Sequence, residues 1–154
     1  MFSEEKLMLK LILSIFIFLS IIISSEKQDI IDVLEKYNKA FGEKKYSEII
    51  KFFDYPASFN LTDKTITASN RFKLKLIYKK IIGSLPNYYS YSKWDDIDIQ
   101  LTDENIAIVN ADFSRYKKDH TIFYSGSAQY LLRLENDRWR IFSLTPYDKI
   151  NTLK

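Results

Sequence analysis

The second half of the sequence consists almost entirely of strand-like segments, and no other feature constrains the fold as much. Four runs rich in β-branched and aromatic residues follow Pro86, and short polar turns join them. The runs are 88–101, 106–117, 121–135 and 139–145. Turns this short connect antiparallel neighbours. Within the second run Ala107, Val109, Ala111 and Phe113 alternate with more polar residues, as a sheet with one buried face requires. We therefore predict an antiparallel meander.

The segments before Pro86 have apolar residues at helical spacing. Positions i, i+3, i+4 and i+7 are apolar in three segments, which predicts three amphipathic helices. These segments are 30–41, 46–53 and 74–85, and a short hairpin is expected between the second and the third, at 57–67. Gly42 is suited to end the first helix and Pro56 to end the second. Ser69 or Asn70 can cap the third. The sequence thus predicts an α+β domain.

The first 25 residues differ from the rest. Leu11–Ile23 contains no charged residue, two lysines precede it, and small residues follow it. This is the layout of a secretory signal peptide. Counted from Leu7, the apolar stretch approaches the roughly 20 residues of a membrane span. We expect residues 1–25 to be a signal peptide or, if uncleaved, a membrane anchor, and residues 26–154 to form one domain. The domain would then be exported, periplasmic or secreted, or would meet a membrane only through its N-terminal segment.

Composition excludes several classes of site. The chain has no cysteine, so it has no disulfide, thiolate metal site or cysteine nucleophile. A zinc or iron site needs two or more imidazoles or thiolates in most families, and His120 is the only histidine. Three glycines are too few for a glycine-rich phosphate loop, and a net charge of +3 is small for a nucleic-acid-binding protein. We expect no metal, no cofactor and no nucleic-acid partner.

Short motifs along the chain resemble those of a known superfamily. Ala40-Phe41 ends the first helix, Phe52-Phe53-Asp54-Tyr55-Pro56 leads into the hairpin, and Phe113-Ser114-Arg115-Tyr116 lies on a central strand. Asp137-Arg138-Trp139-Arg140-Ile141 forms the last hairpin. In this order they are similar to an uncharacterised, SnoaL-like branch of the nuclear-transport-factor-2-like superfamily.

The resemblance implies a cone-shaped fold, with three helices packed on a strongly curved antiparallel sheet and preceded here by an N-terminal hydrophobic helix. It also implies an apolar pocket at the wide end of the cone. Members include isomerases, dehydratases, cyclases and hydrolases as well as noncatalytic binding proteins, so the fold alone does not fix the function.

Ketosteroid isomerase, a member of this superfamily, needs a carboxylate base and an oxyanion hole. The resemblance places Tyr37 at the position of the helix-1 tyrosine of that site. The strand that would carry the base, 57–61, contains no carboxylate. Asp54 and Asp112 are the remaining carboxylates near elements that could face a pocket. Tyr37, Asp54 and Asp112 are therefore weak catalytic candidates.

Aromatic residues could line a pocket for a flat or apolar ligand. The expected pocket-lining residues are Tyr37, Phe59, Tyr91, Trp94, Phe113, Arg115 and Tyr130. Arg115 has the same strand parity as Phe113 and should point inward, where an arginine needs an anionic partner. That partner could be Asp95, Glu135 or a bound carboxylate.

Two function classes follow. The favoured one is an exported, noncatalytic domain that binds a small apolar molecule or a protein partner through its cone pocket, because the catalytic base is missing. The alternative is an enzyme of the isomerase or lyase type. A third hypothesis is a membrane-surface adaptor that uses the basic face of the third helix, although a solvated face is the commoner explanation for such a helix.

The outer face of the sheet predicts a symmetric homodimer. Ile106, Ile108, Phe142 and Leu144 alternate out of phase with the buried residues of their strands. A contiguous apolar patch on a sheet usually marks an interface. Replacing Ile108 with lysine should then give a folded monomer in analytical ultracentrifugation. A wild-type protein that sediments as a monomer at high micromolar concentration would contradict the dimer.

Overall fold

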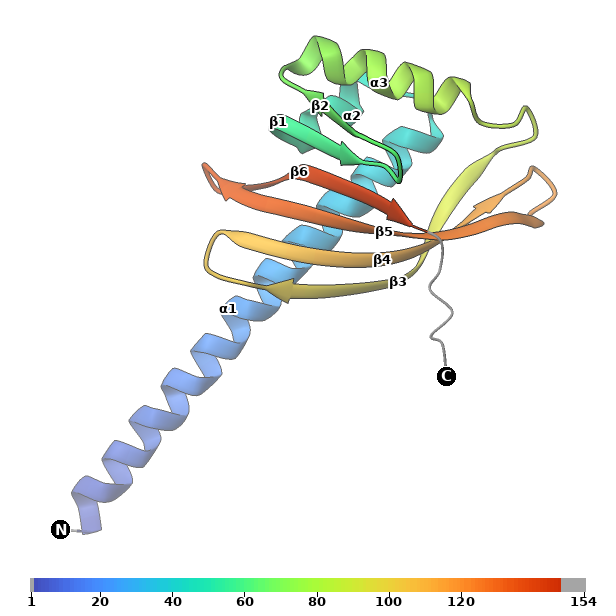
Figure 1. The fold of residues 1–154 in the computed structure, drawn as a ribbon. Coiled ribbons are helices and arrows are strands. Elements are labelled where there is room, and N and C mark those ends of the chain that lie inside the picture. The colour runs from blue at the N-terminus through green and yellow to red at the C-terminus, as the bar shows by residue number, and fades with distance from the viewer. Residues whose placement is uncertain (1, 148–154) are drawn as a thin grey trace. The chain divides into compact units, whose positions relative to one another are not determined.

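The structure, a computed structural model, describes residues 2–147 of the chain, without the side chains of 2–5, 7 and 16–24. The chain divides into two compact units, Met1–Asp32 and Val33–Lys154. Helix α1 (Phe2–Gly42) forms the described part of the first unit and contributes its last turns to the second (Figure 1). The expected N-terminal hydrophobic helix is thus present, as one continuous helix with the first helix of the domain.

Residues 16–23, the larger part of the expected apolar stretch Leu11–Ile23, lie outside the described side chains. In the part of the chain that is described, no helix has the length and apolar character needed to cross a membrane.

The second unit contains one six-stranded sheet. Its strands are β1 (Phe53–Asn60), β2 (Thr65–Ala68), β3 (Tyr91–Leu101), β4 (Ile106–Tyr116), β5 (Ile122–Glu135) and β6 (Arg138–Tyr147). Their order is β2-β1-β6-β5-β4-β3. The predicted meander is confirmed, since β3 to β6 pair antiparallel with their sequence neighbours. The expected all-antiparallel sheet needs one correction: β1 pairs with β6 in parallel. This is possible because a helix and four strands separate the two along the chain, and a parallel pair needs such a long connection.

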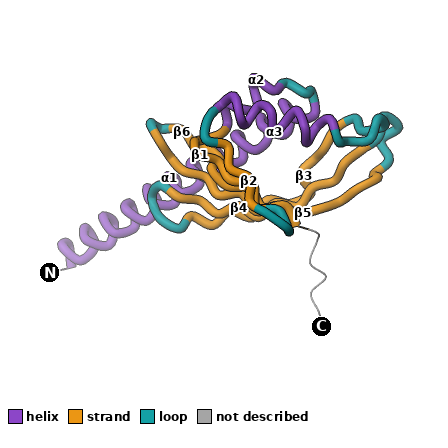
Figure 2. Tube along the Cα trace, turned by 45° about the horizontal axis from the view of Figure 1, so that its top comes forward, coloured by secondary structure: helices purple, strands orange, loops and turns teal. Residues whose placement is uncertain are grey.

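The sheet is strongly curved, and α3 (Arg71–Gly83) lies over its hollow side (Figure 2). Register shifts interrupt the pairing at four places, one in each of the pairs β1–β6, β3–β4, β4–β5 and β5–β6. An extra residue on one strand bends it and increases its twist. These irregularities therefore account for the curvature that leaves space between sheet and helices.

The second helical segment is shorter than predicted. Helix α2 (Tyr46–Ile49) continues as the 3₁₀ turn η1 (Ile50–Phe52), and β1 begins at Phe53. Pro56 consequently lies inside the strand and does not end a helix. Proline removes a ladder hydrogen bond and is tolerated at irregular positions of a strand. The shift in β1–β6 pairing between Phe53 and Ser58 provides such a position.

Asn70 is the residue that caps α3. Its Oδ1 accepts a hydrogen bond of 3.0 Å from the backbone N–H of Lys73. We expect Asn70→Ala to lower the free energy of unfolding by about 1 kcal/mol, because the helix loses its N-cap. Urea denaturation measures this. Ser69→Ala is the matched control and should behave as wild type; equal losses in both variants would contradict the assignment.

The inner face of the sheet forms the core. Ala107, Val109 and Ala111 are buried there as predicted. Leu144, expected on the outer face, instead lies inside, because the register shift between Leu131 and Leu132 changes the parity of β6. Leu144 is therefore not part of the apolar patch that was expected on the outer face as a dimer interface. The outer face carries a polar row in which Gln129 Nε2 donates to Asn110 Oδ1 at 3.2 Å. The homodimer stays a prediction.

Candidate functional site

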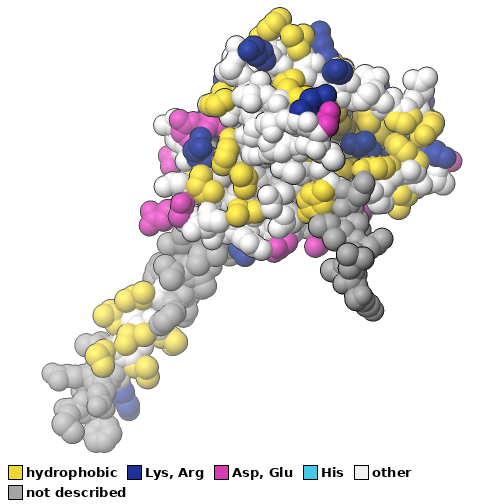
Figure 3. All heavy atoms as spheres, viewed as in Figure 1, with side chains coloured by type: hydrophobic (Ala, Val, Ile, Leu, Met, Phe, Trp, Pro, Cys, Tyr) yellow, Lys and Arg dark blue, Asp and Glu magenta, His cyan; other side chains and the backbone are white. Residues whose placement is uncertain are grey.

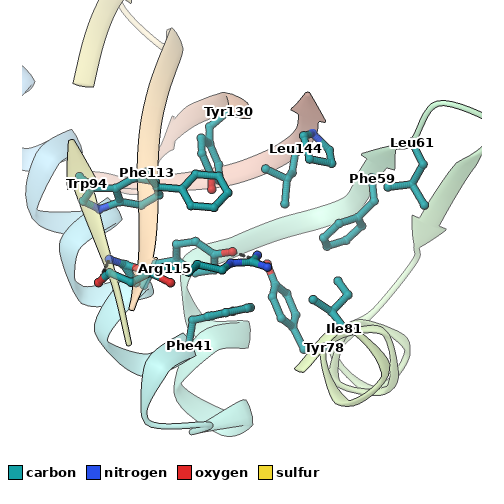
Figure 4. A pocket seen from close by; sticks show the side chains of 14 residues that line it. Phe41, Phe59, Leu61, Tyr78, Ile81, Trp94, Phe113, Arg115, Tyr130 and Leu144 are labelled. Carbon is teal, nitrogen blue, oxygen red and sulfur yellow. Dashed lines mark hydrogen bonds between the residues drawn. The ribbon is translucent and has the colours of Figure 1, made fainter. Parts of the chain in front are cut away.

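A cavity of about 220 Å³ lies between the hollow face of the sheet and the helices (Figure 4). Residues from α1, α3 and every strand except β2 contribute to it, together with Leu61 of the β1–β2 turn. The lining residues are Tyr37, Asn38, Phe41, Phe59, Leu61, Tyr78, Ile81, Ser92, Trp94, Phe113, Arg115, Tyr130, Leu144 and Pro146. None of these described residues is a carboxylate. The wall is mainly aromatic and aliphatic, which is typical of small-molecule sites.

Hydrogen bonds hold one side of the wall in place. Trp94 Nε1 donates to the Leu34 carbonyl at 3.3 Å, and Asn38 Nδ2 donates to the Ser92 carbonyl at 3.0 Å. The Trp94 ring packs edge-on against Phe113 and Tyr130, with centroid separations of 6.3 and 5.9 Å. These contacts tie the end of α1 to β3. The wall is therefore preformed.

Three tyrosines meet at the inner end of the cavity. The hydroxyl of Tyr78 donates to that of Tyr37 at 3.0 Å. Burial raises the pKa of Tyr37, and hydrogen bonds from Tyr78 and Tyr130 oppose that rise. Burial also raises the pKa of Tyr78 and of Tyr130 well above the ordinary value. All three hydroxyls are thus neutral donors at physiological pH.

These raised pKa values predict alkaline unfolding. An unfolded tyrosine loses its proton near pH 10.0, whereas Tyr78 in the folded protein keeps it to higher pH. Above pH 10.0 the native state therefore binds more protons than the unfolded state. The free energy of unfolding keeps its full value below that pH and falls as the pH rises above it. The slope approaches about 1.4 kcal/mol per pH unit for each buried tyrosine. Denaturation midpoints at pH 8 to 11.5 measure it, and Tyr78→Phe should flatten the decline. An unchanged slope would contradict the burial.

Arg115 is the charged residue of the cavity. It extends from β4 toward Tyr78 (Figure 4). Its guanidinium carbon lies 5.3 Å from the Phe113 ring centre and 5.1 Å from that of Tyr124. Its Nε is buried and has no hydrogen-bond partner. Arg115 thus points into the cavity, on the same face of β4 as Phe113, as the sequence predicted.

The model of one protein family matches residues 26–149 of this chain, and the family is described as NTF2-like protein (DUF6841). The match covers most of the sequence and the whole of the cavity. The chain belongs to this family. No curated protein matches the sequence.

Solved structures agree with the NTF2-like fold. A protein of unknown function with a cystatin-like fold from Nostoc punctiforme superimposes with a TM-score of 0.69 at 10% identity, covering 81% of this chain and 92% of its own. An NTF2-like protein of unknown function from Shewanella oneidensis gives 0.64 at 17% identity, covering 80% and 99%. A candidate scytalone dehydratase from Novosphingobium aromaticivorans gives 0.65 at 14% identity, covering 82% and 85%. At these identities the likeness concerns the fold alone.

Of the catalytic candidates, only Tyr37 lies at the cavity of this NTF2-like domain. Asp54 pairs instead with Arg133, with 2.8 Å between Oδ2 and Nη1, and its Oδ1 accepts the N–H of Tyr55. Asp112 accepts a 2.6 Å hydrogen bond from Ser127 Oγ on the outer face. Neither carboxylate is among the lining residues. The expected pairing of these aspartates with Tyr37 is therefore not present.

The expected pocket residues are brought together with one exception. Tyr37, Phe59, Trp94, Phe113, Arg115 and Tyr130 all line the cavity. Tyr91 does not; it lines a separate, more open hollow with Lys39 and Glu43, and its hydroxyl lies 2.9 Å from His120 Nδ1. Tyr91 and Trp94 are three residues apart, and the pairing of β3 with β4 is unbroken between them. Alternation therefore points their side chains to opposite faces, and the expectation that both line the pocket rested on their aromatic character alone.

Sequence reasoning missed several lining residues. Tyr78, Phe41 and Ile81 were recognised only as parts of buried helical stripes. The apolar face of a helix that packs on a curved sheet supplies core residues, and where the sheet bends away it also supplies the wall of the cavity. Tyr78 could have been found by its hydroxyl, because a buried tyrosine needs a partner such as Tyr37.

Proposed function

We propose that this NTF2-like domain binds one small, largely apolar molecule in the cavity and carries out no reaction on it. The supporting observation is the lining: apolar and aromatic residues with neutral tyrosine hydroxyls, and no carboxylate among the described residues. A cavity of about 150 Å³ is known to hold benzene. The cavity here, at about 220 Å³, fits a molecule with one or two rings.

Native mass spectrometry of the full-length protein tests this proposal. Indole and naphthalene-2-carboxamide are the probes, and maltose is the polar control. We expect each ring compound to form a one-to-one complex and maltose to form none. Equal binding of all three, or no complex with either ring compound, would overturn the proposal.

An isomerase or lyase remains the second candidate because of the tyrosine cluster. Tyr37 receives the hydrogen bond of Tyr78, which is an arrangement suited to stabilising an oxyanion. Proton abstraction also needs a base, and the described lining residues offer no carboxylate or imidazole. Loss of the α-deuterium of a bound cyclic ketone into water, abolished by Tyr37→Phe, would favour the enzyme. Retention of the label in the wild type favours binding alone.

We also propose that the domain acts outside the cytoplasm, exported or anchored by residues 1–25. In the first unit the described side chains from Met8 to Ile15 are mostly apolar and exposed (Figure 3). Exposed apolar helix surface is stable in lipid or in a signal-sequence receptor, but not in water. The N-terminal mass of the protein isolated from its cells tests this. A start at about residue 26 or an intact chain in the membrane fraction supports the proposal, and an intact chain in the soluble cytosol contradicts it.

A further inference from the structure

We propose that the ligand is an anion, a compound of one or two rings that carries a carboxylate, and that Arg115 binds this carboxylate. This inference rests on the proposed binding function and adds the chemical class of the ligand. It starts from Arg115 Nε, a buried side-chain donor in the cavity wall that has no hydrogen-bond partner.

Arg115 Nε is buried without a hydrogen-bond partner. Leaving a buried donor of a charged group unpaired is unfavourable, so native proteins rarely do so without a reason. Across the described residues, 2–147, Arg115 forms no ion pair. Its guanidinium makes cation–π contacts with the rings of Phe113 and Tyr124. A ring face attracts a guanidinium but accepts no directed hydrogen bond from Nε.

The two carboxylates that could have paired with Arg115 lie elsewhere. Asp95 Oδ2 accepts a 2.6 Å hydrogen bond from Ser114 Oγ, and Ser114 precedes Arg115 on the strand and so points to the other face. Glu135 is exposed and lies opposite Arg138 at the far end of β5. The sequence allowed three partners for Arg115: Asp95, Glu135 or the carboxylate of a ligand. With both side chains placed elsewhere, the carboxylate of a ligand is the partner that we infer.

The surroundings of Arg115 suit a carboxylate. The neighbouring hydroxyls of Tyr37 and Tyr130 stay protonated because burial raises the pKa of both. The positive charge of Arg115, which lines the same cavity, acts in the opposite direction and lowers the pKa of both. A carboxylate here would accept bonds from an arginine fork and from neutral hydroxyls, and such charge-assisted bonds are the strong ones. The aromatic wall would hold the ring.

The test compares two compounds of nearly equal shape, naphthalene-2-carboxylate and naphthalene-2-carboxamide, by calorimetric titration of the full-length protein. We expect the wild type to bind the acid at least tenfold more tightly than the amide. Arg115→Gln should weaken binding of the acid at least tenfold and change that of the amide less than threefold. Arg115→Lys should keep part of the preference, and Arg133→Gln, which removes an exposed arginine outside the cavity, should keep all of it.

Each other outcome is informative. If the wild type binds acid and amide equally, the inference is wrong and the proposed binding function stands. If it binds neither, both fail. If Arg115→Gln weakens both compounds equally, or if it and Arg115→Lys both melt well below the wild type, Arg115 has a structural role and the inference is overturned.

Discussion

Replacing Tyr78 with alanine should lower the free energy of unfolding by about 3–5 kcal/mol, the usual loss for a large aromatic side chain removed from a core. Tyr78 has no exposed surface. Its ring lies 5.6 Å from Phe53 and 5.8 Å from Phe59, centre to centre, in edge-on contact. The variant leaves a void among these rings. It also removes the hydrogen bond that the Tyr78 hydroxyl donates to the Tyr37 hydroxyl. Two losses therefore act together.

Urea denaturation followed by circular dichroism measures this effect, with two matched variants. Tyr78→Phe removes only the hydroxyl and should cost about 1 kcal/mol. Phe72→Ala, on the same helix but 71% exposed, should change stability by less than about 0.5 kcal/mol. A Tyr78→Ala loss as small as that of Phe72→Ala would show that α3 does not pack on the sheet as described.

Leu144→Trp should abolish binding of a small molecule while the domain stays folded. Leu144 is 9% exposed and lines the cavity from β6. An indole at this position would occupy much of the roughly 220 Å³ that a ligand would need. Adding volume inside a packed core costs about 1–3 kcal/mol, but here the cavity can accept the larger side chain, so we expect a loss at the low end of that range.

The matched control for this variant is Leu131→Trp. Leu131 follows the lining residue Tyr130 on β5 and points to the outer face, where it pairs with Ser143. It adds the same ring without entering the cavity. Titration with naphthalene-2-carboxamide should show wild-type affinity for Leu131→Trp and no saturable binding for Leu144→Trp. Similar affinities in the two variants would place the ligand elsewhere.

Alternation and helical spacing were enough to predict the element order, the meander and the inward direction of Arg115. These are local properties, since successive side chains of a strand point to opposite faces. Parity failed where a strand gains a residue. Leu144 was expected outside, and a register shift in the pairing of β5 with β6 lies beside it. Such shifts come from pairing with a partner strand, which one strand's own sequence does not specify. Tyr91 was expected in the cavity because it is aromatic, although alternation points it away from Trp94.

The partners of the charged side chains were also beyond sequence reasoning. Asp54 pairs with Arg133, 79 residues away along the chain. Arg115 could have paired with Asp95 or Glu135 as far as sequence spacing is concerned. Only the arrangement of the strands shows that both carboxylates lie away from the cavity and that the guanidinium lacks an acidic partner among the described residues.

The central claim, that the cavity binds a small molecule, is tested most directly by the heat capacity change of binding. Calorimetric titration of the full-length protein with naphthalene-2-carboxamide at several temperatures should give one site per chain and a negative heat capacity change, because apolar surface is buried. The signal should persist in Leu131→Trp and vanish in Leu144→Trp. No saturable heat in the wild type, or the same isotherm in Leu144→Trp, would contradict the account.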